Sequence, residues 1–212
     1  YDILVIGGGI NGAAIAYDAA MRGFSVLVVE EEDFASGTSS RSSKLIHGGI
    51  RYLKQFELGL IFESLRERAL LLKLCPHLVR PLPFLYPVFE GASGGSLAVR
   101  IGMNLYDALA LFRTPARHRI LSESEVAERE PALGRKGLRT TARYYDAWMN
   151  DARLVLATML GAIRCGADVL PHTEVRGLLH DGERVHGALL TDRIGGTDLA
   201  VEARLVVNAA GP

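Results

Sequence analysis

One segment gathers most of the side chains that could do chemistry together, GTSSRSSKLIHGGIRYL at residues 37–53. Residues 38–40 supply hydroxyl groups, which can donate hydrogen bonds to phosphate oxygens. His47 can exchange a proton near neutral pH, and the two glycines after it allow the backbone to lie against a flat ring. Arg51 follows, and its guanidinium can grip an anion with two parallel hydrogen bonds. The segment therefore predicts a loop that contacts an anionic ligand.

A glycine motif near the start of the chain suggests what that ligand is. Gly7, Gly9 and Gly12 form G-x-G-x-x-G between a short apolar run and an alanine-rich segment. Gly7 allows a tight turn, Gly9 lets the backbone approach a pyrophosphate, and Gly12 lets a helix pack closely on a sheet. The phosphates would then meet free N–H groups at the positive end of a helix. This pattern predicts a dinucleotide site.

An acidic residue stands where such a site needs one. Glu30 ends the second apolar run, 18 residues after Gly12. A carboxylate there can accept hydrogen bonds from both ribose hydroxyls and repels the 2′-phosphate of NADP. The glycine motif by itself does not separate NAD from FAD. The hydroxyls at 38–40 favour FAD, because they lie where a second phosphate and a ribityl chain could run.

Apolar periodicity and turn signals predict an α/β fold around these residues. Residues 2–30 read as strand, helix and strand, and 56–74 as an amphipathic helix. Residues 75–89 hold too many prolines for a helix and read as a linker with a short strand, where the chain crosses between domains. The expected elements after it are a helix at 96–112, a capping box at Ser122 and Glu125, one or two strands at 137–149, a helix from 150 that stops at Gly166, and short strands to the end.

Composition bounds the class of protein. Of 212 residues, 49% are apolar and 23% charged, with zero formal net charge, which suits a globular protein and gives no argument for nucleic acid as a partner. No apolar run is long enough to span a bilayer. Cys75 and Cys165 lie far apart, and the six histidines show no metal-ligand spacing, so we expect neither a disulfide framework nor a metal site.

Four stretches closely resemble FAD-dependent glycerol-3-phosphate dehydrogenase, the respiratory enzyme, within the wider family of D-amino-acid oxidase and sarcosine oxidase. They are VIGGGINGAAIAYDAAMRG, GTSSRSSKLIHGGIRYL, YDAWMNDARLVLA and LVVNAAGP. The resemblance covers essentially the whole chain. It implies a Rossmann-like FAD-binding domain (1–74 and 147–212) with an inserted, incomplete substrate or cap domain (75–146). It also implies that this chain is the N-terminal portion of a longer protein.

The same resemblance implies the site residues. Arg51 and Tyr52 match positions around the substrate, and the backbone of Val175 would lie near the adenine. His47 is the candidate for the catalytic base or for a donor that tunes the flavin, with a histidine that merely braces the loop as the alternative. The residues expected to line FAD are Gly7, Gly8, Gly9, Gly12, Glu30, Thr38, Ser39, Ser40, Lys44, Leu45, Ile46, His47, Gly48, Gly49, Val175, Ala209, Ala210 and Gly211.

The implied reaction is oxidation of sn-glycerol 3-phosphate to dihydroxyacetone phosphate, with the hydride passed to FAD and electrons on to a quinone. The remaining phosphate ligands would lie beyond Pro212, as would the base if His47 does not supply it. Three alternatives stay open: an oxidase of the same substrate that uses oxygen, an amine oxidase of the D-amino-acid oxidase type, and a binding module without turnover. The expected location is cytoplasmic, peripheral on the cytoplasmic face of the cell membrane. The helix at 96–112 would provide the contact, unless it is simply a buried helix.

Overall fold

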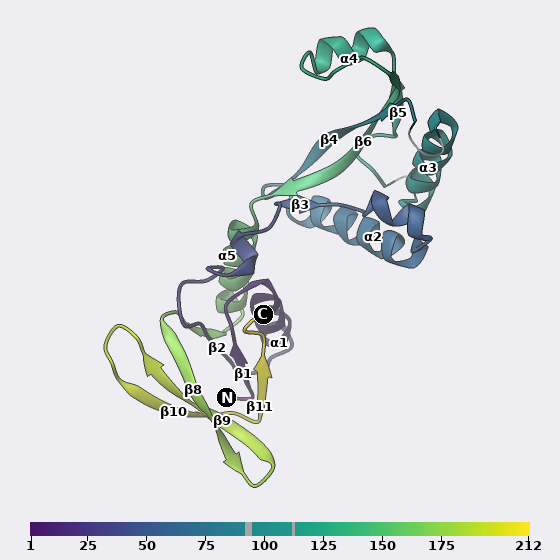
Figure 1. Ribbon diagram of the computed structural model, residues 1–212. Helices are drawn as coiled ribbons and strands as arrows, with labels where there is room; N and C mark the ends of the chain where they lie inside the picture. Colours follow the sequence, from purple (N-terminus) through teal and green to yellow (C-terminus); the bar gives the residue numbers. More distant parts are fainter. Residues whose placement is uncertain (92–94, 112) are drawn as a thin grey trace. The chain divides into compact units, whose positions relative to one another are not determined.

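The structure, a computed structural model, describes residues 1–91, 95–111 and 113–212 (Figure 1). The described chain divides into two compact units. Unit 1 comprises Tyr1–Lys44 and Asn150–Pro212, and unit 2 comprises Leu45–Met149. The domain boundaries predicted from the sequence are 74/75 and 146/147. The first boundary between the two units, after Lys44, lies earlier in the chain than the first predicted boundary.

Unit 1 is built on a parallel sheet with strand order β11-β1-β2-β7. A second, antiparallel sheet follows the order β10-β9-β8. The elements of this unit are β1 (Ile3–Ile6), α1 (Ile10–Met21), β2 (Val26–Val29), the 3-10 helix η1 (Thr38–Ser40), α5 (Asp151–Arg164), β7 (Asp168–Leu170), β8 (Thr173–Asp181), β9 (Arg184–Asp192), β10 (Asp198–Glu202) and β11 (Leu205–Asn208). This α/β arrangement with a parallel sheet is the predicted fold class.

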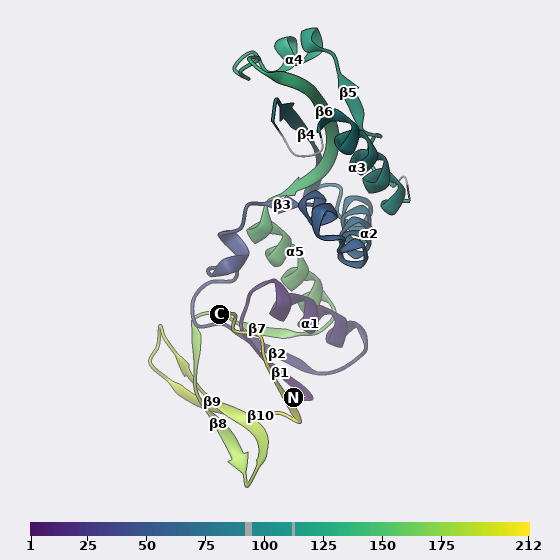
Figure 2. The same ribbon diagram turned by 45° about the vertical axis from the view of Figure 1, so that its right-hand side comes forward.

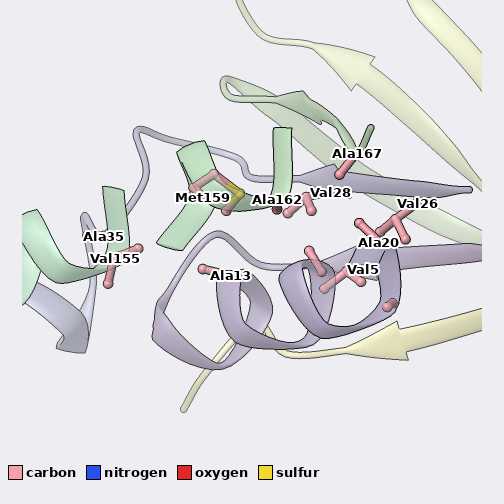
Figure 3. Close-up of a cluster of buried hydrophobic side chains, with 12 residues drawn as sticks. Val5, Ala13, Ala20, Val26, Val28, Ala35, Val155, Met159, Ala162 and Ala167 are labelled. Carbon is pink, nitrogen blue, oxygen red and sulfur yellow. The ribbon is translucent and has the colours of Figure 1, made fainter. Parts of the chain in front are cut away.

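Both faces of the parallel sheet are buried, which explains why its strands are continuously apolar. Alternate side chains point to opposite faces. On one face, Val26 and Val28 pack with small and apolar side chains of α1 and α5 (Figure 3). On the other face, Leu27 and Val29 pack with Ala188 and Leu190 of β9. The alanine-rich side of α1 lets this helix approach the sheet closely.

Unit 2 is organised around one long strand, β6, which pairs with β3, β4 and β5 (Figure 2). Its core combines Ile61 and Leu65 of α2, Met103 and Tyr106 of α3, and Tyr144 of β6. The elements are β3 (Leu45–Ile46), the 3-10 helix η2 (Ile50–Gln55), α2 (Leu58–Leu74), β4 (Val79–Phe89), α3 (Gly95–Leu109), β5 (Arg119–Leu121), α4 (Glu123–Arg129) and β6 (Leu138–Met149).

The expectation of a linker with a short strand at 75–89 is wrong, because β4 is an 11-residue strand. It contains Pro81, Pro83 and Pro87, yet it pairs with β6 along its whole length. The three prolines lie an even number of positions apart, so the positions of their missing N–H groups are all on the same side of the strand. β4 ends the sheet order in the described part of the chain, and an edge strand tolerates proline where the N–H would face away from its neighbour.

Other expected elements are confirmed. The capping box is present, with the Ser122 N–H donating to Glu125 and the Glu125 N–H donating to the Ser122 hydroxyl. Asn150 caps α5 by accepting the Arg153 N–H at 3.1 Å. The helix expected at 96–112 is α3, although Phe112 lies outside the described residues. Within the ranges that the structure describes, no helix is long and apolar enough to cross a membrane.

Candidate functional site

The predicted ligand residues of unit 1 lie at one edge of its parallel sheet. The Gly7 N–H, directly after β1, donates to the Val29 carbonyl at 2.8 Å. The Ala209 N–H, directly after β11, donates to the Ile6 carbonyl at 2.8 Å. Because these strands run parallel, their carboxyl ends share one edge, which is where open α/β sheets bind ligands. The structure thus brings the glycine turn together with the residues that follow β2 and β11.

Two glycines of the motif, Gly7 and Gly12, are required by close backbone contacts. Gly7 has a φ of +109°, and a Cβ on it would overlap the Ala209 carbonyl. A Cβ on Gly12 would overlap the carbonyl oxygen of Gly7, so α1 can start directly against the turn. A Cβ on Gly9 would lie 3.1 Å from the Ser39 Oγ. The turn therefore presents bare backbone at the N-terminus of α1, where N–H groups of the first turn have no intrahelical acceptor.

Glu30 is held directly beside this turn. Its Oε2 accepts the Gly8 N–H at 2.6 Å, and its Oε1 accepts the Glu32 N–H at 3.0 Å. A carboxylate offers about four acceptor positions, so both oxygens keep capacity for further donors such as ribose hydroxyls. The half-buried carboxylate is thereby oriented before any ligand binds.

The hydroxyl segment reaches the start of α1 through Ser39. Its Oγ accepts the Ile10 N–H at 3.0 Å, which satisfies one free donor of the helix. The Ser39 hydroxyl hydrogen remains available to a phosphate placed before the helix, where the dipole favours negative charge. Ser40 donates to the Gly37 carbonyl at 3.2 Å, and Thr38 is exposed. Of the three predicted hydroxyls, Ser39 has the clearest geometric link to the glycine turn.

A buried carboxylate anchors the end of this segment. Asp151, the first residue of α5, accepts the Ser42 hydroxyl at 2.6 Å. Burial opposes ionisation of this group, but hydrogen bonds from Ser42 and from the Ala152 N–H, with the charge of Lys44, outweigh it and hold the pKa of Asp151 below its ordinary value. Ser42 also accepts the Lys44 N–H at 3.0 Å. The sequence analysis missed this anchor, because 109 residues separate its two partners.

The strand expected to approach the adenine lies next to Glu30. The Thr173 N–H donates to the Glu30 carbonyl at 2.7 Å, and the His172 N–H donates to the Glu32 carbonyl at 2.9 Å. Val175 follows on β8 and packs, partly buried, against the apolar cluster on that face of the sheet. Val175 and Glu30 are therefore held in the same region of unit 1.

The chain after β11 passes against the glycine turn, where a Cβ on Gly7 would overlap backbone atoms of Ala209 and Ala210. The Ala210 N–H donates to the Asn208 side chain at 3.1 Å, and Gly211 has a φ of +89°. Lys44 is the remaining predicted ligand residue of unit 1. Its backbone has a φ of +59°, a value that residues other than glycine rarely adopt. Residues 209–211 thus extend from the edge that carries the glycine motif.

The remaining predicted residues belong to unit 2. Leu45 and Ile46 form β3, and His47 after them is exposed. Gly48 and Gly49 are buried, and Arg51 and Tyr52 lie in η2. The sequence-predicted residues therefore fall into two groups, each brought together within its own unit.

Gly48 has a packing reason to be glycine. A Cβ on it would overlap side-chain atoms of Leu65 and the Tyr106 hydroxyl. Gly49 has a φ of +69°, and a Cβ there would lie 2.5 Å from the Tyr52 ring. The backbone at Gly48 therefore lies directly on the core of unit 2, and the backbone at Gly49 lies against the Tyr52 ring.

An apolar pocket of about 790 Å³ opens in unit 2 between η2, β4 and α3. Arg51 lines it together with apolar side chains that include Leu53, Phe56, Val99 and Met103. Its volume is in the range of small-molecule sites. The lining suits an apolar molecule with one anionic or polar group that Arg51 could bind.

Sequence reasoning also missed Asp146, which lies towards the C-terminal end of β6. Its Oδ1 accepts the Gly48 N–H at 3.1 Å and the Tyr106 hydroxyl at 2.8 Å, and it forms a buried ion pair with Arg68. Burial, followed by the charge of Asp146, raises the pKa of Tyr106, so this hydroxyl stays protonated as a donor. Burial likewise raises the pKa of Tyr144 to about 12. The available signal was an aspartate among aromatic and apolar residues in the strand segment YYDAW.

The residues of unit 1 fit the adenosine and pyrophosphate portion of a dinucleotide. Bare backbone stands before a helix N-terminus, a hydroxyl lies beside it, and an oriented carboxylate ends the neighbouring strand. These are the donors and acceptors that pyrophosphate and ribose require. Gly7, Gly9, Ser39 and Glu30 are the residues that would hold FAD there.

Comparisons with known proteins agree with this assignment. The family described as FAD dependent oxidoreductase matches residues 2–212. The chain is 40% identical over 213 aligned residues to the aerobic glycerol-3-phosphate dehydrogenase of Staphylococcus aureus (strain USA300), covering 100% of this chain and 38% of that protein. This chain therefore spans just over a third of the length of the curated relatives it matches.

Solved structures show the same likeness. The glycerol-3-phosphate dehydrogenase of Bacillus halodurans, complexed with FAD, is 35% identical with a TM-score of 0.75, covering 100% of this chain and 34% of that one. The L-proline dehydrogenase of P. horikoshii is 21% identical with a TM-score of 0.72, covering 99% and 52%, and supports the fold alone. With its parallel sheet, glycine turn and oriented Glu30, the chain belongs to the FAD dependent oxidoreductase family.

Proposed function

We propose that this chain is the FAD-binding, N-terminal part of an enzyme that oxidises sn-glycerol 3-phosphate to dihydroxyacetone phosphate. The single observation that carries the proposal is the 40% identity to an aerobic glycerol-3-phosphate dehydrogenase along the whole of this chain. The geometry at the sheet edge supports the cofactor part. The domain assignment stays part of the proposal, with residues 1–74 and 147–212 binding FAD and residues 75–146 belonging to a substrate or cap domain.

In this proposal each residue group of unit 1 has a defined task. Glu30 binds the ribose hydroxyls, and the turn at Gly7–Gly9 with Ser39 binds the pyrophosphate. Thr38, Ser40, Lys44 and the segment 209–211 complete the cofactor contacts, with Val175 near the adenine. Gly12 keeps α1 close enough for its free N–H groups to reach the phosphates.

The residues of unit 2 act on the substrate and the flavin ring. When bound, FAD supplies the acceptor for the hydride that leaves C2 of the substrate. Leu45, Ile46, Gly48 and Gly49 place backbone against the ring, and His47 removes the C2 hydroxyl proton. Arg51 and Tyr52 bind the phosphate; a dianion needs more than one cation, and the further ligands would come from the rest of the protein.

A quinone is the proposed electron acceptor. The apolar pocket of unit 2 supports this choice, because most of the side chains that line it are apolar. Oxygen as the acceptor defines the competing oxidase. The proposed location is the cytoplasmic face of the membrane, and the exposed apolar side chains of α3 supply the supporting observation.

The test is substrate-dependent bleaching of the flavin in the purified full-length protein without oxygen. We expect sn-glycerol 3-phosphate to bleach the flavin absorbance, and a quinone analogue to restore it faster than oxygen does. Bleaching by an amino acid instead would favour the amine oxidase. If neither class of substrate changes the flavin spectrum, the result would favour a binding module without turnover.

A further inference from the structure

A buried carboxylate fixes the loop that carries His47. Gly48 N–H, Tyr106 O–H and the Arg68 guanidinium all donate to the same oxygen, Oδ1 of Asp146. Arg68 is 0% exposed, Tyr106 1% and Asp146 2%. All four residues belong to unit 2. This is a charged network packed beside the apolar cluster of unit 2, to which Leu65, Tyr106 and Tyr144 belong.

Burying such a network costs desolvation free energy, so a contribution to the stability of the fold does not by itself explain it. Arg68 also donates to the Tyr145 carbonyl at 2.8 Å, but its Nε and Nη2 have no hydrogen-bond partner within the described residues. Apolar side chains of similar size often replace a buried ion pair without loss of stability. The incomplete satisfaction of Arg68 therefore points to a role for the carboxylate that an apolar residue would not perform.

The position of Asp146 in the strand register shows that role. β3 pairs with β6 through Leu45 opposite Trp148 and Ile46 opposite Ala147. One step further along the register, Asp146 stands opposite His47, and β3 has ended. The Asp146 side chain takes up the Gly48 N–H there, in place of a further backbone bond. His47 is therefore held on both sides, by the β3–β6 ladder before it and by the bond at Gly48 after it.

Packing prevents the loop from adopting another path. Gly48 lies against Leu65 and the Tyr106 hydroxyl so closely that a Cβ would overlap both. Tyr106 is itself bonded to Asp146. The side chain of His47 projects from this rigid support and is exposed.

From these contacts we infer that Asp146 is a positioning residue, which holds His47 in its working place through the Gly48 N–H, with Arg68 orienting the carboxylate through the buried ion pair. The inference rests on the proposed function, in which His47 removes the substrate proton. Asp146 is buried beneath the loop and acts through the backbone rather than on the substrate.

Two double variants of the full-length holoenzyme separate the hydrogen bond from the ion pair. R68M/D146N and R68M/D146L both lack the buried charges. Only the asparagine variant keeps an oxygen that can accept the Gly48 N–H. Each is compared with the wild type at matched FAD content, and R68M/D146A replaces the leucine variant if that protein does not retain FAD.

The first readout is hydrogen exchange of the peptide containing Gly48. A typical hydrogen bond contributes about 1 kcal/mol, which corresponds to several-fold to tenfold in an opening equilibrium. We expect this peptide to exchange about tenfold faster in the leucine variant than in the wild type. In the asparagine variant its exchange rate should stay within about threefold of the wild-type rate. Equal exchange in the two variants would overturn the inference.

The second readout is steady-state turnover of sn-glycerol 3-phosphate. A misplaced catalytic group costs on the order of 10²-fold, so we expect kcat of the leucine variant to fall about 10- to 100-fold, with KM changed less than about threefold and kcat largely restored in the asparagine variant. Different exchange with equal kcat would show that the bond does not position His47. If the wild-type flavin is not reduced by this substrate, the proposed function fails on that control alone, and the exchange readout still decides whether Asp146 holds the loop.

Discussion

The carboxylate of Glu30 accepts the backbone N–H of Gly8 at 2.6 Å, so the end of the second strand and the glycine turn form one rigid unit before a ligand is present. The two residues lie 22 positions apart in the chain. Because the acceptor is a carboxylate, the bond is charge-assisted and stronger than a neutral one. The orientation of Glu30 is thus fixed by the same turn that would bind the pyrophosphate.

Replacing Glu30 by glutamine should weaken FAD binding. The substitution removes the negative charge and lets only one side-chain oxygen accept. Hydrogen bonds to a charged group contribute about 1.5–3 kcal/mol, so we expect the dissociation constant of FAD to rise about 10- to 100-fold. Titration of the apoprotein with FAD measures this. Glu32→Gln, at an exposed neighbour, is the matched control and should bind as the wild type does; equal affinities for both variants would show that Glu30 does not contact the cofactor.

Gly12→Ala should destabilise the protein and reduce its FAD content. The new Cβ would overlap the Gly7 carbonyl oxygen, so α1 or the turn must move. Overpacking of this kind costs about 1–3 kcal/mol. Gly59→Ala, in α2 with nothing within 4 Å of the added Cβ, is the control and should be neutral or slightly stabilising. Thermal unfolding and the ratio of flavin to protein absorbance measure both effects, and a wild-type melting temperature for Gly12→Ala would contradict the close contact.

Ser42→Ala should destabilise unit 1 in a pH-dependent manner. It removes a 2.6 Å bond to Asp151 and should cost about 1–2 kcal/mol near neutral pH. The pKa of Asp151 lies below its ordinary value in the folded protein. Its stabilising contribution is therefore fully present above the unfolded pKa of about 4 and is lost as pH falls through the folded value.

Denaturant unfolding of wild type and Ser42→Ala from pH 7 down to pH 3 tests this dependence. We expect the difference in free energy of unfolding to shrink at the acidic end. Ser43→Ala, at the exposed neighbouring serine, serves as the control. A constant difference across the range would argue against an ionised Asp151 as the partner.

His47→Gln should reduce turnover far more than substrate binding. Loss of a general base typically costs about 10²- to 10⁴-fold in rate. We expect kcat to fall by that order, because the group that removes the hydroxyl proton is gone. His77→Gln, at an exposed histidine in the same unit, is the control. If kcat falls less than about threefold, His47 braces the loop and the base lies elsewhere.

Charge introduced on the exposed side of α3 should abolish vesicle binding. Leu97 is 69% exposed and Ile101 61%, whereas Leu109 packs against the core of unit 2. In a vesicle flotation assay, we expect the full-length wild-type protein to bind vesicles that contain anionic lipid and to float with them. The L97E/I101E variant should remain in the aqueous fraction. Leu160→Glu, at an exposed leucine of α5, should still float. Absence of wild-type binding would remove the membrane part of the proposal.

Several features followed from local sequence because they depend on neighbouring residues. The G-x-G-x-x-G spacing between two apolar runs indicated the strand, turn and helix, and the terminal acid indicated Glu30. The helix start at Ser122 was readable from its capping box, whereas for the later helix the sequence left Asn150 and Asp151 open as the cap and the structure shows Asn150. Residues 75–89 were misread because proline tolerance depends on whether a strand lies at the edge of a sheet, and only strand order decides that.

By itself, the sequence determined the α/β fold and the dinucleotide type of cofactor, because backbone conformation at glycines, helix caps and short apolar runs are all short-range properties. Tertiary structure alone decided how the site residues are supported. Gly48 meets Asp146 across 98 residues, and Ser42 meets Asp151 across 109. No periodicity or motif connects such partners, since their contact arises only when separate strands and helices pack into one core.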